Sequence, residues 1–337
     1  MRVMRFMNTT LKANCHLRRM IAFLLFFLFN FFNSVAQAPL PQSFLDSAGI
    51  SNAQKVNCGV DLMLDKLRRD PSFRMREAQM NQEILRVQGT LDDTIITLPV
   101  VVHIVDLNPN AITDAQVIAG IKLLNDAFSK SGIYSASMGA DTKIRFCLAK
   151  TDPLGGITTG ITRTTSFFSN SLNKDIEDAR LKNLIQWDPV HYINIWLIHS
   201  IESEAYASFS CGSWYRLRVG GYATLPPGGG ALDGIVVTGF GAILAHEMGH
   251  YLGLYHTFQG GCFNNDCTTD GDMVCDTPPD NSVKPSAGCS TPENSCHTDT
   301  LSSHSNGFFP VDVPDQISNF MDYGNGSCSN QFTQGQA

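Results

Sequence analysis

Eleven consecutive residues constrain this chain more than any others. They run from His246 to His256 and read HEMGHYLGLYH. His246 and His250 are four residues apart, so on an α-helix their imidazoles lie on one face, one turn apart, and can bind a single metal ion. Glu247 lies one position further round the helix, where its carboxylate can reach a water held by that metal without being a ligand. The spacing therefore predicts a two-histidine metal site with a general base beside it.

A third ligand requires the helix to end soon after His250. Gly253 permits this, because glycine adopts positive φ at little cost and can turn the chain back. His256 would then face the metal as the third ligand. Three histidines with an open fourth position are typical of a catalytic zinc site. The string H-E-x-x-H-x-x-G-x-x-H is the metzincin pattern, which also requires a methionine turn downstream.

A candidate methionine turn lies at Asn319 to Tyr323 and reads NFMDY. With this turn, the chain resembles the pappalysin-type metzincin zinc metalloproteases, whose bacterial members include ulilysin-like secreted enzymes. The resemblance extends from about Thr94 onward, and its motifs are the turn and residues 246–258, 271–278 (GDMVCDTP) and 332–336 (FTQGQ). It implies that Met321 lies beneath the histidines as an apolar floor, and that Tyr323 reaches the metal or the substrate oxyanion.

The first 38 residues have the pattern of a secretory signal peptide. They carry five Lys or Arg and no acidic residue, then an apolar run from Ile21 to Phe32, and they end in Ala36-Gln37-Ala38. A run of about 12 apolar residues is shorter than the roughly 20 that span a bilayer, so cleavage after Ala38 is favoured over a membrane anchor. The basic leader is long, and Met7 or Met20 is an alternative start.

Charge and cysteine content fit export. Without the leader, the chain carries 19 basic and 31 acidic residues, a net charge of −12. Such an acidic surface argues against partners that are nucleic acids or anionic membranes, and it suits calcium binding. Nine cysteines remain outside the leader, and in an exported protein disulfides are their expected state. Because nine is odd, we expect one free thiol.

Residues 39–93 look like a pro-region. They are polar and helix-prone, with a break at Pro71 and no dense apolar strand, so they should pack on a larger domain rather than fold alone. Secreted relatives carry a Cys-Gly pair here, and the resemblance implies that the Cys58 thiolate occupies the open zinc position and keeps the enzyme latent. The alternative is that Cys58 is an ordinary unpaired thiol or joins a disulfide.

From Thr94 the pattern predicts an α/β (α+β) fold. A near-continuous apolar run at 98–106 is typical of a buried strand, and Thr113 and Gln116 form a capping box before an apolar stripe at helical spacing. We further expect strands at 143–149, 192–199 and 235–238, a helix at 172–186 and the active-site helix from Gly241. His103, His191 and His199 are expected to be structural or surface residues.

This order of elements predicts one metzincin-type catalytic domain over residues 94–337, with a mixed twisted sheet, a backing helix and an active-site helix. Its subdomains would be residues 94–256 and an irregular, disulfide-rich part at 257–337. Thr333 and Gln336 look like the capping box of a helix that barely begins, so we expect the second subdomain to be truncated. Residues 220–226 have the pattern of an edge strand, which could hold an extended peptide by β-augmentation or could be a plain edge hairpin.

The segment from Gly260 to Pro314 has five cysteines and hardly any apolar periodicity, so other links must hold it. The resemblance implies two disulfides here, Cys262–Cys296 and Cys289–Cys328. A local Cys267–Cys275 pair and a Cys147–Cys211 pair would complete four and leave Cys58 free. A structural zinc site at these cysteines is disfavoured, because the segment has no C-x-x-C spacing and the chain is exported.

Hard oxygen ligands are concentrated in the same segment. The resemblance implies a stabilising calcium ion, and a solvated acidic turn is the alternative. The candidate ligands are Asp272, Asp276, Thr277 and Asp280.

We therefore predict a secreted zinc endopeptidase made as a latent zymogen, acting on protein or peptide substrates as a monomer without stable membrane association. Glu247 would serve as general base, and Tyr323 would help to stabilise the oxyanion. A zinc-bearing adhesion or binding module without catalysis, and a metal hydrolase of a non-peptide amide, are the alternatives. Some relatives select Arg or Lys after the scissile bond through an acidic residue that follows the methionine turn. Residues 324–327 (GNGS) contain none, so basic specificity is not implied.

Overall fold

The computed structural model describes residues 58, 60–87, 94–210, 213–263, 266–281, 289, 293–297, 309, 311–323 and 328–337. The predicted signal peptide and residues 39–57 of the predicted pro-region lie outside these ranges. Within the described part of the chain, no helix combines the length and the apolar character needed to cross a membrane.

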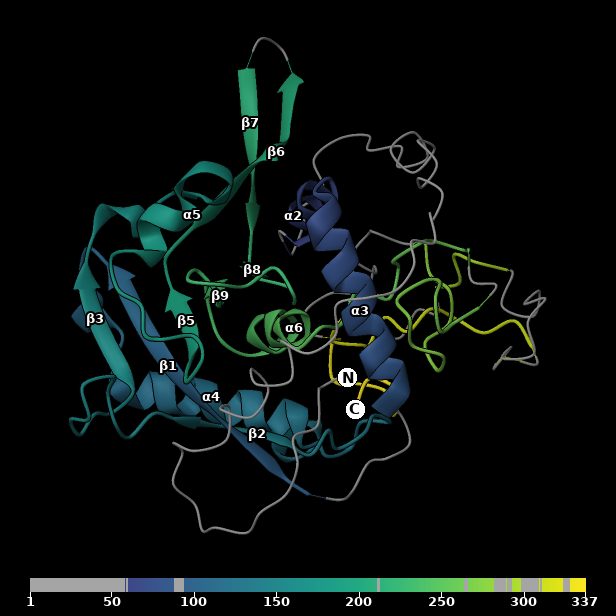
Figure 1. The fold of residues 1–337 in the computed structure, drawn as a ribbon, viewed down its shortest axis with the longest axis horizontal. Coiled ribbons are helices and arrows are strands. Elements are labelled where there is room, and N and C mark those ends of the chain that lie inside the picture. The colour runs from purple at the N-terminus through teal and green to yellow at the C-terminus, as the bar shows by residue number, and fades with distance from the viewer. Residues whose placement is uncertain are drawn as a thin grey trace.

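A six-stranded sheet forms the centre of the fold (Figure 1). Its strands are β1 (Ile96–Asp106), β2 (Ile144–Leu148), β3 (Ile161–Thr165), β5 (Ile193–Leu197), β8 (Gly221–Ala223) and β9 (Ile235–Val237). The order is β2-β1-β5-β9-β8, and β3 pairs with the second half of β1. All pairings are parallel except β8 with β9, so β8 is an antiparallel edge strand.

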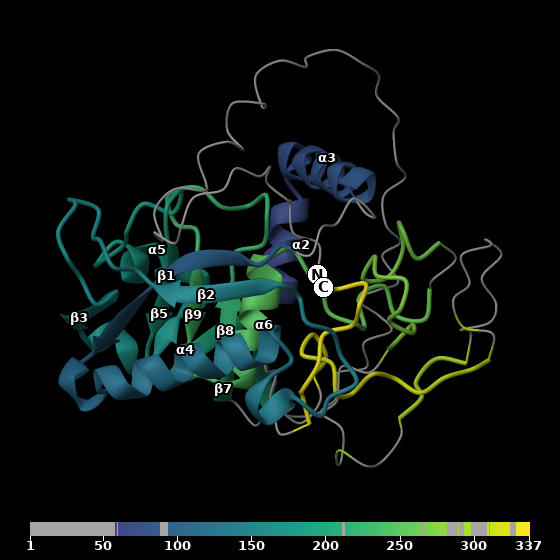
Figure 2. The ribbon, with the colours of Figure 1, turned by 90° about the horizontal axis from the view of Figure 1, so that it is seen from below.

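Helices cover both faces of this sheet (Figure 2). Helices α4 (Asp114–Phe128) and α6 (Ala242–Tyr251) pack on one face, which includes Val100, Val102 and Ile104 of β1. Helix α5 (Lys174–Lys182) packs on the other face, in a cluster with Val105 and Trp196. Side chains alternate along a strand, so successive residues of β1 enter the two layers in turn.

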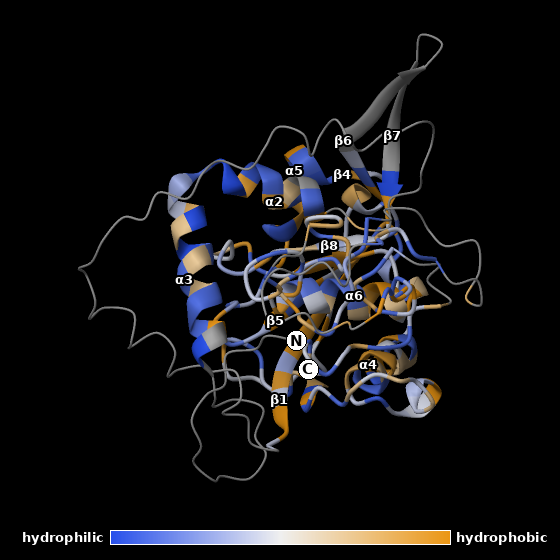
Figure 3. Ribbon diagram, turned by 90° about the vertical axis from the view of Figure 1, so that its right-hand side faces the viewer, coloured by the Kyte–Doolittle hydropathy of each residue, from blue (hydrophilic) through white to orange (hydrophobic). Residues whose placement is uncertain are grey.

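Helix α4 begins where the sequence predicts. The Thr113 hydroxyl accepts a hydrogen bond from the Gln116 backbone N–H (3.3 Å), and the Gln116 side chain accepts one from the Thr113 N–H (2.8 Å). This reciprocal pair satisfies two N–H groups that a helix start leaves free. Both β1 and α4 are rich in hydrophobic residues (Figure 3), as the predicted stripe requires.

Helix α5 is shorter than the predicted helix at 172–186. Leu172 and Asn173 form the short strand β4 (Leu172–Asn173), which pairs with β6 (Ile201–Ser210), and Asn173 then caps α5 by accepting from the Asp175 N–H (3.1 Å). The sequence pattern also missed β3 and the hairpin of β6 and β7 (Ser213–Val219), which projects from the body of the molecule (Figure 1).

The predicted pro-region contributes two helices, α2 (Val60–Arg68) and α3 (Pro71–Val87). Leu64 and Phe73 share a hydrophobic cluster with Leu225 and Tyr255 of the domain below. Phe73 is 1% exposed, and burying a side chain of that size contributes roughly 1.5–3 kcal/mol. These helices pack on the rest of the protein instead of forming a core of their own. The predicted α/β class, with its mixed sheet, backing helix and active-site helix, is confirmed.

Candidate metal centre

Three imidazoles meet at one point at the end of α6. The Nε2 atoms of His246 and His250 are 3.1 Å apart, those of His250 and His256 3.0 Å, and those of His246 and His256 3.3 Å. Tetrahedral zinc with Zn–N bonds of roughly 2.0–2.1 Å needs nitrogens about 3.3–3.4 Å apart. The structure thus brings the three predicted ligands together at separations that fit one zinc ion.

The turn after α6 produces this convergence. Gly253 has φ of 100°, a conformation that side-chain-bearing residues rarely adopt. The Leu254 N–H donates to the Gly249 carbonyl (3.0 Å) as the helix ends. The chain can therefore reverse within a few residues and return His256 to the same face as His250.

Each imidazole is fixed by its second nitrogen. Nδ1 of His246 contacts the Phe320 carbonyl (2.5 Å), Nδ1 of His250 the Leu254 carbonyl (2.8 Å), and Nδ1 of His256 the Asp61 carboxylate (2.6 Å). Carbonyl and carboxylate oxygens accept hydrogen bonds, so each Nδ1 carries the proton and each Nε2 has its lone pair free for a metal. Burial lowers the pKa of His246 to about 3 and that of His250 well below its usual value, which keeps both rings neutral.

Glu247 lies against the edge strand β8. A Cβ at Gly221 would come within 2.9 Å of the Glu247 Oε1 atom, so this close approach requires glycine. Glu247 is fully buried, and its Oε1 has no hydrogen-bond partner among the described residues. Burial raises the pKa of Glu247 well above its usual range. A carboxyl group with a raised pKa is suited to exchange protons near neutral pH.

Cys58, in the predicted pro-region, reaches into the histidine cluster. Its Sγ and the three histidine ligand atoms all lie within 4.8 Å of one another, and the Sγ–H donates to the Glu247 Oε2 atom (3.5 Å). Burial raises the pKa of the Cys58 thiol, and the Glu247 and Asp61 carboxylates raise it further. Cys58 also forms a parallel bridge with Gly221. Within the described part of the chain, one group of three or more His, Cys, Asp or Glu side chains lies close enough together to hold a metal ion. It consists of Cys58, His246, His250 and His256.

Asp61 is a second pro-region group at the centre, and the sequence pattern gave it no role. Besides its contact with His256, Asp61 accepts a hydrogen bond from the Tyr323 hydroxyl (3.0 Å). The same hydroxyl lies 3.2 Å from the Cys58 carbonyl. Burial alone would raise the pKa of Asp61, but His256 and the Tyr323 hydroxyl hold it below its usual value. The feature of the sequence that could have indicated this role is the acidic residue three positions after Cys58.

Met321 lies directly under α6. A Cβ at Gly249 would come within 2.4 Å of the Met321 sulfur, which shows how closely the two pack. The Thr257 N–H donates to the Met321 carbonyl (3.2 Å), so the turn also supports the segment that carries His256. Met321 thus contacts the helix that carries two of the histidines, and its role as an apolar floor beneath them stays a prediction.

A buried polar cluster joins α2 and α3 to the residue before the third histidine. The Tyr255 hydroxyl donates to Glu77 (2.7 Å), and Glu77 forms an ion pair with Arg68 (2.8 Å). The Arg68 guanidinium lies 5.3 Å from the centre of the Tyr255 ring. Burial and the Glu77 carboxylate raise the pKa of Tyr255, which keeps its hydroxyl protonated as a donor. The sequence pattern did not indicate this cluster.

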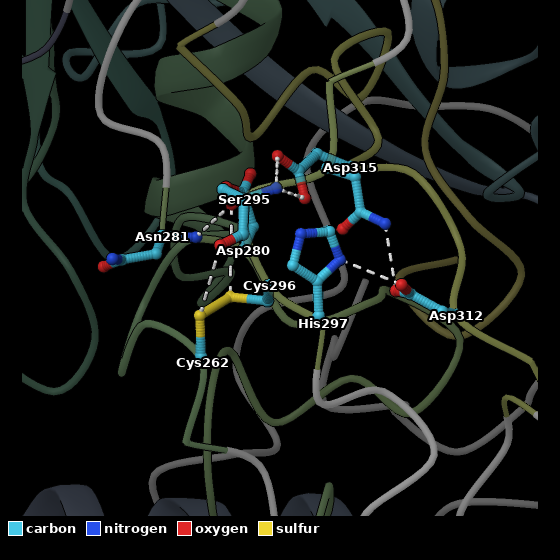
Figure 4. Close-up of a disulfide and its surroundings, with 9 residues drawn as sticks. Cys262, Asp280, Asn281, Ser295, Cys296, His297, Asp312 and Asp315 are labelled. Carbon is cyan, nitrogen blue, oxygen red and sulfur yellow. Dashed lines mark hydrogen bonds and ion pairs between the residues drawn. A yellow bond between two sulfur atoms is a disulfide. The ribbon is translucent and has the colours of Figure 1, made fainter.

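Three of the expected disulfides are present in the second subdomain: Cys262–Cys296, Cys267–Cys275 and Cys289–Cys328. Next to the first of them, Ser295 lies between two carboxylates (Figure 4). Its hydroxyl donates to Asp280 (3.0 Å) and its N–H to Asp315 (3.0 Å). Cys58 is a free thiol and Cys147 is disulfide-bonded, whereas Cys211 lies outside the described residues.

The candidate calcium ligands have several protein partners. Asp272 accepts from the Thr277 hydroxyl (2.8 Å) and the Val274 N–H (3.0 Å). Asp276 accepts instead from the Thr333 hydroxyl (2.6 Å) and the Gly335 N–H (2.8 Å). The structure thus brings Asp272 and Thr277 together, ties Asp276 to the C-terminal turn, and places Asp280 against Ser295.

Comparison with protein families agrees with this geometry. The family model described as "Pregnancy-associated plasma protein-A" (peptidase M43) matches residues 175–337. "Extracellular metalloprotease 1" of Coccidioides posadasii is 45% identical over 96 residues, which span 28% of this chain and 28% of that relative. An "Extracellular metalloprotease" of Sordaria macrospora is 28% identical over 300 residues, 86% of this chain and 88% of that relative.

Two solved structures from Tannerella forsythia are similar in fold. A mutant of promirolysin has a TM-score of 0.60 and 26% sequence identity, and the match covers 83% of this chain and 91% of the other. Mature mirolysin in complex with a cleaved peptide has a TM-score of 0.52 and 27% identity, with 73% and 90% covered.

Proposed function

This chain belongs to the pappalysin-type metzincin metalloproteases, and on that premise we propose that it is a secreted zinc endopeptidase made as a latent zymogen. Its relatives include several extracellular metalloproteases, which supports export. The observation that carries the proposal is the set of three Nε2 atoms 3.0–3.3 Å apart, with the carboxylate of Glu247 beside them.

His246, His250 and His256 would hold the zinc ion, which when bound supplies Lewis acidity toward water and the scissile carbonyl and favours the thiolate of Cys58. Glu247 accepts a proton from the attacking water and delivers it to the amine of the leaving peptide. Tyr323, freed from Asp61, donates a hydrogen bond to the oxyanion of the tetrahedral intermediate. Main-chain carbonyls fix the rings of His246 and His250, so two of the three ligands are oriented before substrate arrives.

Peptides are the substrates best supported. The edge strand β8 runs beside Glu247, and an extended peptide can add to such an edge through main-chain hydrogen bonds. The structure of mature mirolysin with a cleaved peptide supports the same substrate class. A hydrolase of small non-peptide amides would not need an edge strand at its site.

Latency would follow from the way the pro-region occupies the centre. Cys58 pairs with Gly221 on the β8 edge and directs its thiol at the metal position, so a substrate cannot use either. Asp61 holds the Tyr323 hydroxyl that would otherwise face the oxyanion. The match to promirolysin covers more of this chain than the match to mature mirolysin, 83% against 73%, which supports a pro-region before the catalytic domain.

The test is the variant Glu247→Ala. After the pro-region has been removed from both proteins by an added protease, we expect the variant to keep its zinc but to hydrolyse casein or a peptide mixture about 10²- to 10⁴-fold more slowly. Zinc content measured by atomic emission is the control for an intact site, and a chelator should abolish the parent's activity. Near-normal hydrolysis by the variant would rule out Glu247 as the base, and a parent that binds zinc without cleaving any peptide would favour a binding module.

A further inference from the structure

Beneath the edge strand β8 lies a buried ammonium group that the proposed mechanism does not use. It belongs to Lys182, the last residue of α5, whose side chain is 1% exposed. Its Nζ atom lies 3.0 Å from the Asp178 carboxylate, one helical turn earlier, and donates to the Leu232 carbonyl (3.0 Å). The same atom lies 5.4 Å from the centre of the Tyr222 ring and 5.5 Å from the centre of the Trp196 ring. One ammonium group thus connects α5 with β8, with β5 and with the loop between β8 and β9.

Tyr222 links this ammonium group to the substrate-binding edge. It is the middle residue of β8, and side chains alternate along a strand, so its ring lies on the face opposite to Gly221, which packs against Glu247. The Tyr222 hydroxyl donates to the same Asp178 oxygen that pairs with Lys182 (2.6 Å). Burial and the Asp178 carboxylate raise the pKa of Tyr222 well above its usual value, so the hydroxyl stays protonated as a donor. Strand β8 therefore lies between Glu247 on one face and this polar cluster on the other.

The loop that follows β8 is fixed at two successive residues. Leu232 accepts from Lys182, and the Asp233 carboxylate accepts from the hydroxyl of Tyr251 at the end of α6 (3.2 Å). Strand β8 has three residues, and within the described part of the chain β9 is the one strand that pairs with it. Few main-chain hydrogen bonds thus fix the position of β8, and the side-chain contacts from α5 and α6 matter correspondingly more.

The contribution of this buried ion pair lies in geometry more than in stability. Removing an ammonium group from water costs free energy that offsets much of its attraction to a carboxylate, and well-packed apolar side chains in its place are often as stabilising. Apolar side chains cannot supply direction, however. The ammonium of Lys182 donates along defined lines to Asp178 and to the Leu232 carbonyl, and so relates α5 to the loop that carries β8 into β9.

We propose that Lys182 is a positioning residue for peptide binding: acting through Asp178 and Tyr222, it sets the position of β8 relative to Glu247. The inference rests on the proposed function, because it requires that a substrate peptide pairs with β8. A peptide makes those main-chain hydrogen bonds in the ground state and in the transition state alike. Displacement of β8 should therefore raise KM and leave kcat nearly unchanged.

The experiment measures kcat and KM of the zinc-loaded enzyme on an octapeptide, after an added protease has removed the pro-region. We expect Tyr222→Phe to raise KM by about 3- to 10-fold, as for the loss of one hydrogen bond. Lys182→Met should raise it by about 10- to 100-fold, because a displacement of about 1 Å can cost that much. Tyr192→Phe is the matched control, since this buried hydroxyl donates to the Thr151 carbonyl (2.9 Å) and packs in a separate cluster. A small hydroxamic acid, which binds zinc without spanning β8, should inhibit the parent and the variants equally.

These readouts separate positioning from a loss of folded protein. If Lys182→Met does not fold, Tyr222→Phe still provides the test, because it keeps the ring and the pair of Lys182 with Asp178. Partial unfolding would lower the active fraction and hence the apparent kcat, with KM unchanged. An unchanged KM in Tyr222→Phe, or a fall in kcat alone, would overturn the inference and leave the peptidase intact. Failure of the zinc-loaded parent to cleave any peptide would instead overturn the proposed function.

Discussion

At the scale of single residues, two pro-region side chains engage different parts of the same centre. Cys58 directs its sulfur at the metal position and at Glu247. Asp61 contacts His256 and the Tyr323 hydroxyl, on the side where the oxyanion would form. Because the two contacts are distinct, loss of one should leave the other in place, and latency should decline in steps.

We expect Cys58→Ala to raise the activity of the intact precursor without making it equal to the processed enzyme. Asp61→Asn, added to it, should raise precursor activity by a further ~10-fold or more, because hydrogen bonds to a charged group contribute roughly 1.5–3 kcal/mol. The measurement is initial peptide hydrolysis by precursor shown by mass spectrometry to be uncut. Asp65→Asn, on the exposed side of the same helix, is the control, and full latency of the double variant would contradict the two-contact account.

At the scale of elements, Tyr255 is one of the residues through which α2 and α3 contact the rest of the protein. This residue lies between Gly253, which turns the chain, and His256, which the turn positions. Its hydroxyl donates to Glu77, and Arg68 completes the cluster from the neighbouring helix. Removal of the two helices would expose the Tyr255 ring beside the third histidine. Tyr255 is thus one of the residues that link the packing of α2 and α3 to the segment that carries His256.

Glu77→Gln should loosen this attachment. The variant loses the charge that pairs with Arg68 within a largely buried cluster, at a cost of about 1–3 kcal/mol, which corresponds to a roughly 5- to 150-fold larger population of the opened state. Hydrogen exchange of the α3 amides, read by mass spectrometry, measures this directly. The comparison is Glu83→Gln on the same helix, whose carboxylate pairs with Arg86 at the surface. Equal exchange rates in the two variants would mean that the contact between Tyr255 and Glu77 does not hold α3 in place.

The sequence predicted contacts between residues close together in the chain better than contacts between residues far apart in it. The three histidines and Gly253 lie within eleven residues, so helical spacing and one glycine turn were enough to relate them to one ion. The contact of Asp61 with His256 spans 195 positions and follows no local rule. Strand β3 (ITRTT) was missed because it has one aliphatic residue and no apolar alternation, and its pairing with β1 defines it as a strand.

At the scale of the whole molecule, the two predicted subdomains are each stabilised by different interactions. The first is built on a sheet with apolar layers on both faces, whereas the described part of the second has three disulfides and few regular elements. The second subdomain nevertheless supplies Met321 and Tyr323 to the centre. Its rigidity is therefore a requirement of the site, and any ion that stabilises it should affect the activity as well as the melting temperature.

Calcium is the candidate ion, and its effect can be tested separately from zinc. If Asp272, Asp276, Thr277 and Asp280 contribute to a calcium site, calcium at about 100 times its dissociation constant would add roughly 2.7 kcal/mol to the free energy of unfolding. For a domain of this size that raises the melting temperature by about 5–10 °C. We expect this rise in zinc-buffered solution when calcium is added, and we expect Asp272→Asn to reduce it.

Asp312→Asn, at an exposed carboxylate of the same subdomain, is the matched control. A melting temperature that does not respond to calcium would favour the alternative, in which these carboxylates are satisfied by Thr277, Thr333 and Ser295 alone.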